Sequence, residues 1–465
     1  MSSNIRKRTS FATRLGFILV TAGCAVGLGN VWRFPYITGQ SGGSFFVILY
    51  LLFLICLGIP MMSVELAIGR ASRKSIAQAF TELREDKKGW NCVSYASMAG
   101  LYLLMSYYSV ISGWLLYYCY QTFTGDIIGI SETQIGENFS NLMADPTTQI
   151  TSAVSVLFLA SLVCVRGLRN GIERMVKPSM LGMLVIMVIM IFHSCSLEGA
   201  SEGLSFYLYP NWEAVEKIGF GKVLYNALTQ VFFSLSIGIG SIMIFGSYMS
   251  KEHSIIKEGF IICVLDTVVA FMAGLIIFPS CFSYNISPSA GPTLVFETML
   301  QLFNKMPHGH LWGSLFFLFL TIAALTTVIA VVEAIIKGYS ELFSVNRFKS
   351  TIINFFAISA LAVPVALGSN KLSFIQPFGE GSSVLSLFDF IVSNNLLPLG
   401  AIMMVLFCVS KIGWGWNNYL NEINTGSGIK LPAGKWGMYY YKYFIVLVVV
   451  AVLIIGYYDV FIGIR

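Results

Sequence analysis

Long apolar stretches separated by short polar segments run through almost the whole chain. Eleven of them are nearly free of charged residues, and they match the roughly 20 residues that a membrane-spanning helix needs. These stretches cover residues 14–38, 44–69, 90–123, 147–165, 177–196, 222–249, 257–283, 310–338, 350–368, 386–409 and 438–459. The pattern predicts an all-α polytopic membrane protein with about 11 transmembrane helices. The third and eighth stretches are long, so we expect these helices to be tilted or to extend beyond the bilayer.

The composition is that of a chain lying mostly in lipid. Of its 465 residues, 56% are hydrophobic and 11% are charged, against about 25% charged residues in soluble domains. In such a chain the net charge of +6 does not indicate nucleic-acid binding, and we expect no nucleic-acid partner. The nine cysteines show no paired spacing, so we interpret them as small packing residues.

Basic residues alternate between the two sides of the predicted membrane. The residues before the first apolar stretch are basic, and so are the loops around residues 70–88 and 166–177. The loop at 124–146 holds four acidic residues and no lysine or arginine, and the loop at 197–217 holds four glutamates and one lysine. Because lysine and arginine are enriched in cytoplasmic loops, the N-terminus is predicted to lie inside the cell.

Two glycine-rich segments interrupt predicted helices at matching places. Residues 26–30 read Val-Gly-Leu-Gly-Asn in the first stretch, and residues 237–241 read Ile-Gly-Ile-Gly-Ser in the sixth. They lie five helices apart, so the second copy would cross the membrane in the opposite sense. Such paired breaks are typical of inverted-repeat transporters and of their binding sites. Two glycine packing faces in a helix bundle are the alternative interpretation.

A helix break in mid-membrane offers its own chemistry. Unwinding frees backbone groups that lipid cannot satisfy; carbonyls suit a cation such as sodium, and the N-terminus of a half-helix suits a carboxylate. Asp266 lies deep in the seventh stretch, and no lysine or arginine lies at similar depth in another predicted helix. This favours a cation site over a structural ion pair. Glu65 could equally be structural, accepting hydrogen bonds from freed amides.

Other polar residues inside the predicted helices also have an ordinary interpretation. Helical hydroxyls usually bond back to the preceding turn, and neighbouring tyrosines usually pack within a bundle. This alternative applies to Ser234, Ser236, Thr326, Thr327, Tyr107 and Tyr108.

Five segments, in order along the chain, resemble the signature blocks of one family. The first block is FATRLGFILVTAGCAVGLGNVWRFPY (11–36), and it continues in SGGSFFVILYLLFLICLGIPMMSVELAIGR (41–70). Later blocks are RGLRNGIERMVKPSM (166–180), QVFFSLSIGIGSIMIFGSY (230–248) and AALTT (323–327). On these residues almost the whole chain resembles the neurotransmitter:sodium symporter family, in particular its bacterial amino-acid transporter branch.

The resemblance implies one transmembrane transporter domain, residues 1–465, with a five-plus-five inverted repeat and broken helices 1 and 6. Repeat one would cover about 11–196, repeat two about 218–410, and an extra helix about 438–459. The implied function is sodium-coupled amino-acid import across the bacterial inner membrane. We expect no enzyme, because the sequence shows no nucleophile–base pair or metal cluster of suitable spacing. The sequence does not indicate the oligomeric state.

The resemblance also implies particular site residues, with two sodium ions bound. The first sodium would be held, together with the substrate carboxylate, by the Ala25 carbonyl, Asn30, Ser234 and Asp266. The second would be held by the carbonyls of Gly23, Val26 and Ala323 and the hydroxyls of Thr326 and Thr327. The substrate pocket would comprise Ala25, Gly29, Leu104, Tyr108, Phe233, Ser234, Ser236, Ile239, Thr327 and Val331. Tyr108 would bond the carboxylate, and Phe233 would close over the substrate. An outer gate would pair Arg33 with Asp389, and an inner gate would pair Arg8 with Glu341 beside Tyr248.

The chain departs from the family pattern in three places. Many members have asparagine at the position of Asp266, and chloride-dependent members use a serine where this chain has Ala270. The carboxylate therefore predicts transport without chloride. Glu341 replaces an aspartate at the inner gate, and the chain stops after its eleventh helix, as some bacterial members do.

The pocket positions indicate the substrate class. Amine-transporting relatives carry an aspartate where this chain has Gly27, so an amino acid fits better than an amine. Ile239 and Val331 stand where the leucine-transporting bacterial member has larger side chains, which predicts a bulky apolar or aromatic substrate. A channel-like protein or a transport-dead sensor on the same fold is the alternative function.

Overall fold

The computed structural model describes residues 10–84, 88–287 and 294–461, and every named element in these ranges is a helix. Nine helices there are long and apolar enough to cross a membrane, and one further span is a bent helix pair. The eleventh span consists of two helices, α12 (Phe220–Leu235) and α13 (Met243–Tyr248), which are separated by residues 236–242. The predicted all-α polytopic fold is therefore confirmed, with a helical counterpart for each of the eleven apolar stretches.

The first six spans run from α1 to α13. In chain order they comprise α1 (Arg14–Ala25) with η1 (Gly29–Arg33) and α2 (Phe34–Gln40), α3 (Ser44–Phe53) with η2 (Leu54–Gly58) and α4 (Ile59–Ser72), α6 (Asn91–Thr124), α8 (Pro146–Val165), η4 (Leu168–Glu173) with α9 (Arg174–Cys195), and α12 (Phe220–Leu235) with α13 (Met243–Tyr248).

The remaining five spans run from α14 to α22. They comprise α14 (Ile255–Ser283), α16 (Gly309–Phe343), α17 (Arg347–Leu367), α18 (Val384–Asp389) with η6 (Phe390–Leu396) and α19 (Leu397–Val409), and α21 (Lys435–Tyr439) with η7 (Tyr440–Ile445) and α22 (Val446–Phe461). The expected long helices, α6 and α16, have 34 and 35 residues.

Short helices also form in the loops between spans, and the hydrophobic pattern did not predict them. They are α5 (Ile76–Leu83), η3 (Lys88–Trp90), α7 (Glu132–Ala144), α10 (Ala200–Leu208), α11 (Trp212–Ile218), η5 (Leu294–Thr298), α15 (Met299–Lys305) and α20 (Trp416–Ile423). Two of them begin with a capping side chain, Ser131 before α7 and Asn211 before α11. Caps of this kind are local signals that a search for membrane spans passes over.

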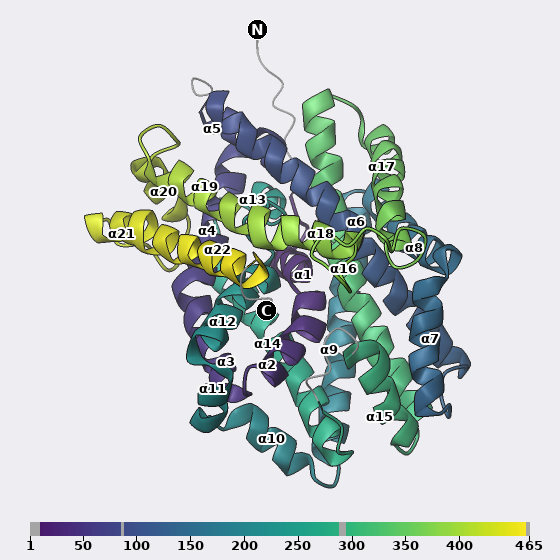
Figure 1. Ribbon diagram of the computed structural model, residues 1–465. Helices are drawn as coiled ribbons and strands as arrows, with labels where there is room; N and C mark the ends of the chain where they lie inside the picture. Colours follow the sequence, from purple (N-terminus) through teal and green to yellow (C-terminus); the bar gives the residue numbers. More distant parts are fainter. Residues whose placement is uncertain (1–9, 85–87, 288–293, 462–465) are drawn as a thin grey trace.

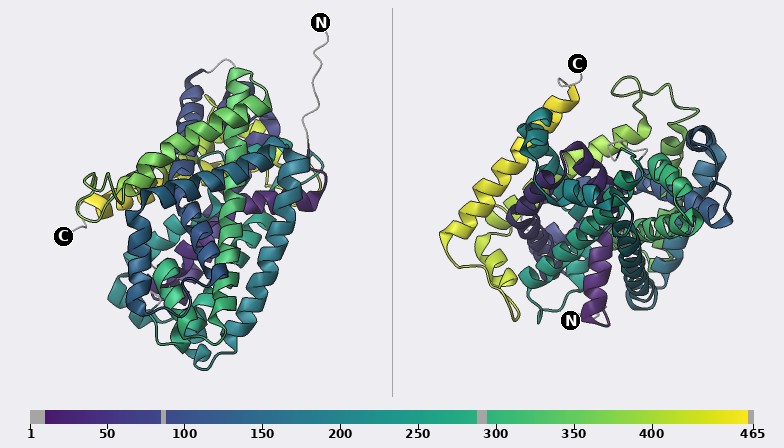
Figure 2. Two further views of the ribbon diagram at one scale, coloured as in Figure 1. Left: turned by 90° about the vertical axis from the view of Figure 1, so that its right-hand side faces the viewer. Right: turned by 90° about the horizontal axis from the view of Figure 1, so that it is seen from below.

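The bundle has a buried centre and a lipid-facing periphery. α1 is buried along nearly its whole length, and α6 and α16 are mostly buried, whereas α9 and the α21–α22 span are mostly exposed. Figures 1 and 2 show α21 and α22, in yellow, lying along one side of the bundle. The broken helices therefore pass through the interior, where an unwound backbone can be shielded from lipid.

The first break separates α1 from η1 by three residues. Val26 takes an extended conformation (φ −64°, ψ 106°), and the chain bends by 58° between the two halves. Val26 and Gly27 form the non-helical bend, and helical conformation resumes at Leu28, directly before η1. The predicted interruption of the first span is confirmed.

The second break, residues 236–242, separates α12 from α13. Ser236, Gly238 and Gly240 all have positive φ, of 51°, 99° and 81°. Gly238 also has no room for a side chain, because an added Cβ would lie 1.9 Å from the Leu397 carbonyl oxygen of α19. The Gly238 N–H donates to Glu65 Oε1, so Glu65 accepts a hydrogen bond from a freed amide as the structural interpretation expected.

Candidate ion and substrate sites

The first cluster of polar groups joins the two broken helices to α14. Asn30 Nδ2 donates to Ser234 Oγ at 3.1 Å and to the Asp266 carbonyl at 2.9 Å, and Ser234 Oγ donates to Asp266 Oδ2 at 2.8 Å. The side chains of all three residues are fully buried. Asp266 Oδ1 is buried without a hydrogen-bond partner among the described residues. A buried carboxylate oxygen left without a donor fits a cation as its missing partner.

The second cluster surrounds the hydroxyl of Thr327 on α16. Its Oγ1 lies 2.9 Å from the carbonyl oxygen of Val26, 3.2 Å from that of Gly23 and 3.3 Å from that of Ala323. One hydroxyl proton can satisfy only one of these three carbonyls. The convergence of four oxygens around one proton therefore fits a hard cation such as sodium.

Thr326 makes a different contact from its neighbour. Its Oγ1 donates to the Ala323 carbonyl at 2.9 Å, which is the ordinary bond back to the preceding turn. Thr326 thus shares one carbonyl with the cluster around Thr327, and its predicted role at the second sodium remains a prediction.

A small cavity of about 20 Å³ borders Thr327 of the second cluster, and its lining includes Gly29 and Phe233, the chain neighbours of Asn30 and Ser234 in the first cluster. Seven of the ten predicted substrate residues line it: Ala25, Gly29, Leu104, Tyr108, Phe233, Ser236 and Thr327. The remaining three lie elsewhere: Ser234 belongs to the first cluster, and Ile239 and Val331 are fully buried outside the lining. The lining also includes Gly27, Leu28, Tyr107 and Leu397.

Tyr108 and Gly27 shape the middle of this cavity. The Leu28 N–H donates to Tyr108 Oη at 3.1 Å, so the tyrosine hydroxyl keeps its own proton for another acceptor. A Cβ added to Gly27 would lie 2.4 Å from Tyr108 Oη and 2.6 Å from Thr327 Oγ1. Any side chain at position 27 would therefore displace both hydroxyls.

A much larger cavity of about 570 Å³ lies on the other side of Phe233. Both predicted outer-gate residues, Arg33 and Asp389, line it, together with Tyr107 and Tyr108. The Arg33 guanidinium lies 4.4 Å from the centre of the Phe233 ring, and Asp389 Oδ1 accepts a hydrogen bond from Ser393 Oγ at 2.7 Å. The two gate residues share one cavity, and within the described chain no ion pair joins them.

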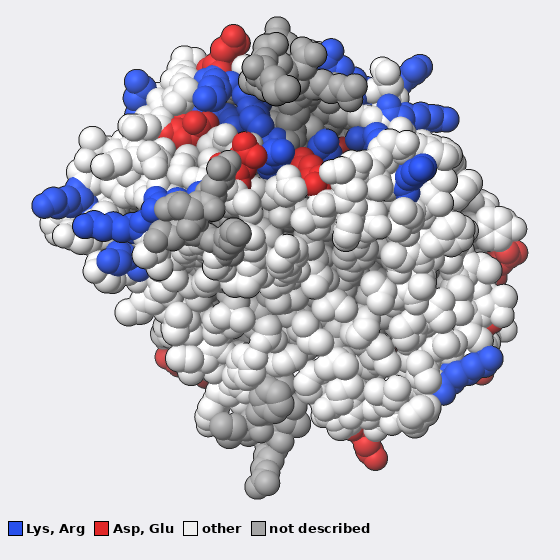
Figure 3. All heavy atoms as spheres, turned by 90° about the horizontal axis from the view of Figure 1, so that it is seen from above, with Lys and Arg blue, Asp and Glu red and all other residues white. Residues whose placement is uncertain are grey.

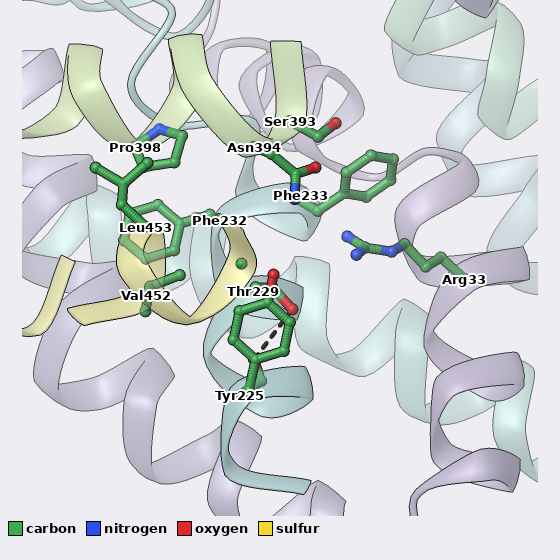
Figure 4. A pocket seen from close by; sticks show the side chains of 11 residues that line it. Arg33, Tyr225, Thr229, Phe232, Phe233, Ser393, Asn394, Pro398, Val452 and Leu453 are labelled. Carbon is green, nitrogen blue, oxygen red and sulfur yellow. Dashed lines mark hydrogen bonds between the residues drawn. The ribbon is translucent and has the colours of Figure 1, made fainter. Parts of the chain in front are cut away.

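A third cavity of about 40 Å³ is lined by Arg33 and Phe233, together with residues of α12, η6 and α22. Figure 4 shows Arg33 reaching toward Phe233 from one side, with Thr229 and Tyr225 of α12 below and Val452 and Leu453 on the opposite side. Arg33 and Phe233 therefore have free volume on two sides.

The predicted inner gate lies partly outside the described residues, because Arg8 does. Glu341 Oε2 accepts hydrogen bonds from the backbone N–H of Ser75 at 2.8 Å and from its hydroxyl at 2.6 Å. Tyr248 Oη donates to Glu333 Oε1 at 3.0 Å, and Glu333 is paired with Arg347. Among the described contacts, Glu341 bonds Ser75, the N-cap residue of α5, and Tyr248 bonds Glu333 on α16.

Sequence reasoning missed Glu333 and Arg347, and it missed Leu28 and Leu397. Glu333 carried a signal, since it is a carboxylate inside the apolar stretch 310–338. Leu397 carried none, because an apolar residue in an apolar helix does not show which neighbour it faces. Tyr107, interpreted as packing, lines both the small and the large cavity.

The fold and these clusters define a secondary transporter. Two broken helices carry oxygen clusters next to a small cavity, and a larger cavity shares the lining residues Leu28, Tyr107, Tyr108 and Phe233 with it. The arrangement can hold small cations and a carboxylate at the depth of the helix breaks.

Comparisons with known proteins agree with this class. The model of the Sodium:neurotransmitter symporter family matches residues 8–131 and 134–461. An uncharacterized sodium-dependent transporter of Bacillus subtilis, YhdH, is 32% identical over 450 residues, which cover 97% of each chain. An uncharacterized sodium-dependent transporter of Haemophilus influenzae is 33% identical over 417 residues, which cover 88% of this chain and 90% of the relative.

A solved structure gives the same result. The crystal structure of MhsT in complex with L-phenylalanine superposes with a TM-score of 0.85 at 32% identity, over 96% of this chain and 99% of that chain. The chain belongs to the sodium:neurotransmitter symporter family and is a sodium-dependent, multi-pass membrane transporter, not an enzyme.

The Glu333–Arg347 pair generates a prediction about stability. Glu333 is fully buried, so Arg347→Gln would leave its charge without compensation and should cost about 3–5 kcal/mol. We expect the thermal unfolding midpoint of the purified protein to fall by several degrees. Lys305→Gln is the matched control, because Lys305 pairs with Glu132 at 2.7 Å on the exposed surface. Equal midpoints for the two variants would contradict the expectation.

Proposed function

We propose that this transporter imports a hydrophobic or aromatic amino acid together with two sodium ions, by alternating access and without chloride. The observation that carries the proposal is that a small cavity borders Thr327 of one oxygen cluster and the chain neighbours of Asn30 and Ser234 of the other, in which Asp266 Oδ1 has no hydrogen-bond partner among the described residues. We assign the membrane to the bacterial inner membrane and the division of the chain to repeats at about 11–196 and 218–410, with an extra helix at about 438–459.

The ion sites follow from the two clusters. Asn30, Ser234 and Asp266, with the Ala25 carbonyl, would hold the first sodium. The carbonyls around Thr327, with Thr326, would hold the second. The first cluster offers a carboxylate and the second only neutral oxygens; the substrate carboxylate would be a further ligand of the first sodium, as the family resemblance implies.

The substrate class follows from Gly27 and Tyr108. Position 27 has no space for the acidic side chain that would pair with an amine, because an added Cβ already meets Tyr108 Oη at 2.4 Å. The Tyr108 hydroxyl accepts from Leu28 and can donate to a carboxylate. An amino acid supplies that carboxylate, and MhsT, the structural relative, was crystallised with L-phenylalanine.

Binding requires the pocket to expand. A cavity of about 20 Å³ holds one or two water molecules and no amino acid. The free volume on both sides of Phe233 lets this side chain move aside for an entering substrate and return over it.

The orientation rests on the charged loops. Figure 3 looks onto the end of the molecule where α5 lies, and its Lys and Arg side chains gather over one part of an otherwise largely uncharged face. The loops at 70–88 and 166–177 supply many of the basic residues of the chain. We therefore place the N-terminus in the cytoplasm.

The proposed stoichiometry supplies enough driving force. One charge crossing 100 mV is worth about 2.3 kcal/mol, so two sodium ions give about 4.6 kcal/mol. At about 1.4 kcal/mol per tenfold, this supports roughly a thousandfold accumulation of a zwitterion before any sodium gradient is added.

The substrate is tested by competition in proteoliposomes. Sodium-dependent uptake of labelled phenylalanine should be inhibited most strongly by tryptophan, tyrosine and leucine, since the pocket is apolar and has no amine-pairing acid. Stronger inhibition by glycine or alanine would contradict the proposed substrate. Sodium-dependent binding without uptake would instead indicate a transport-dead sensor.

The independence from chloride is tested in the same vesicles. Asp266 brings a fixed negative charge to the first site, and Ala270, one turn further along α14, offers no hydroxyl for an anion. Replacing chloride by gluconate at constant sodium should leave the initial uptake rate unchanged. A rate that falls to background without chloride would disprove this part of the proposal.

The second sodium site is tested with Thr327→Val. Losing the hydroxyl that meets three carbonyls should raise the sodium concentration for half-maximal uptake by about tenfold, the equivalent of about 1.4 kcal/mol. Thr321→Val is the matched control, because Thr321 lies on the same helix and its hydroxyl bonds the Leu115 and Phe317 carbonyls, outside the proposed site. Equal sodium dependence in both variants would remove Thr327 from the site.

A further inference from the structure

Gln149, in the first turn of α8, is a fully buried polar residue. Its Oε1 accepts a hydrogen bond from Trp114 Nε1 of α6 at 3.2 Å. Its Nε2 donates to the Met143 carbonyl of α7 at 2.8 Å and to Ser369 Oγ, two residues beyond α17, at 2.9 Å. The amide therefore joins three other segments of the chain to α8.

The three partners share a second property, because Trp114, Met143 and Ser369 all line the cavity of about 570 Å³. Gln149 itself is not part of this lining. The lining also includes Phe233, which borders the small substrate cavity as well. Gln149 thus lies behind one wall of the large cavity and fastens three parts of it.

These contacts require an amide at position 149. An indole N–H can only donate and a backbone carbonyl can only accept, so one side chain must offer both an acceptor and a donor. Methionine has a similar length but offers only a weak acceptor. An ionised glutamate accepts from Trp114 but cannot donate to the Met143 carbonyl. The chemical type of residue 149 therefore decides whether the wall keeps its bonds.

Trp114 depends on Gln149 more than the other partners do. The Met143 carbonyl also accepts from Ser369 Oγ and from Asn370 Nδ2, both at 3.1 Å. In the described part of the chain, the Trp114 N–H has Gln149 Oε1 as its one acceptor. A buried N–H without an acceptor is costly, and the nearest water would be that of the cavity which the indole already lines. Without the amide, the indole would turn its N–H toward this water and narrow the cavity.

We propose that Gln149 is a positioning residue for substrate entry. By holding the Trp114 indole in the wall, it keeps the large cavity wide enough for an amino acid to reach Phe233. The inference rests on the proposed function, which makes this cavity the route of the substrate. Gln149 lines neither cavity and belongs to neither ion cluster. Its loss should therefore raise the barrier to passage in both directions and leave the bound state unchanged.

The first test measures access to the cavity and needs no substrate. Ile111 lines the cavity on α6, between Trp114 and Tyr108, and none of the nine native cysteines lines it. Full-length protein carrying Ile111→Cys is labelled with a trimethylammonium methanethiosulfonate, and the protein without this substitution gives the background. Adding Gln149→Met should lower the labelling rate by about fivefold, on the scale of one lost hydrogen bond. An equal rate with and without Gln149→Met would contradict the inference.

A change at Trp114 separates the indole from a general loosening of the wall. In a Trp114→Phe background no N–H needs an acceptor, so Gln149→Met should leave the labelling rate of Ile111→Cys unchanged. A fivefold fall in this background too would show that the effect does not run through Trp114, and would overturn the inference.

Two further variants complete the first test. Gln121→Met is the matched control, because Gln121 also lies on α6, bonds Tyr117 on the same helix and does not line the cavity. It should leave the labelling rate unchanged. Gln149→Asn serves if Gln149→Met does not fold: its amide is one methylene shorter and cannot reach Trp114 and Met143 together, so the rate should again fall. An unchanged rate in folded Gln149→Asn would disprove the role of Gln149.

The second test follows labelled phenylalanine on the solubilised full-length protein at saturating sodium. Gln149→Met should slow association and dissociation by the same factor and leave the dissociation constant unchanged. A merely structural role would lower the fraction of protein that binds without changing either rate, which would count against the inference. A changed dissociation constant would assign Gln149 to the bound state and would also overturn it.

The two tests distinguish this inference from the proposed function. If the wild type binds no phenylalanine, the proposed substrate is wrong. Labelling of Ile111→Cys then still decides whether Gln149 holds the cavity open.

Discussion

The structure depends on one constraint: a backbone polar group inside the membrane must find a partner within the protein. Two helices are interrupted at residues 26–28 and 236–242, so backbone groups there lose their helical partners. The surrounding side chains bond only some of these groups. Glu65 Oε1 accepts a hydrogen bond from the Gly238 N–H, and Asn30 Oδ1 accepts one from the Gly27 N–H at 3.2 Å. The carbonyls of the first break converge on Thr327, which cannot satisfy all of them. The oxygens left over are the reason why cations fit here.

The molecule is asymmetric about its central cavity. On the side of Arg33 and Asp389, a cavity of about 570 Å³ reaches Phe233, and a second void lies beside it. On the opposite side, Tyr248, Glu333 and Arg347 form a buried network between α13, α16 and α17. The geometry is that of a transporter open toward the Arg33 side and packed toward the other.

Much of the site could be predicted because its signals are local in the sequence. Gly27, Gly29 and Asn30 mark the first break within a few residues, and Asp266 stands out as a carboxylate in an apolar helix. Resemblance to a family then assigned these residues to ions and substrate. Ile239 shows what this approach leaves open. Its position in the motif predicts that it lies at the pocket, and in the structure it also packs against Gly100, more than a hundred residues earlier.

The sequence by itself determined the membrane spans, the places where two of them break and the chemical types of the groups at the breaks. These properties follow from hydrophobicity and backbone freedom, which act over a few neighbouring residues. Only the tertiary structure decided which oxygens meet at Thr327, how Gly238 fits against α19, that Glu333 pairs with Arg347, and that Ile239 packs against Gly100 of α6. These contacts join distant helices. Their geometry is set by close packing among side chains, which no local pattern encodes.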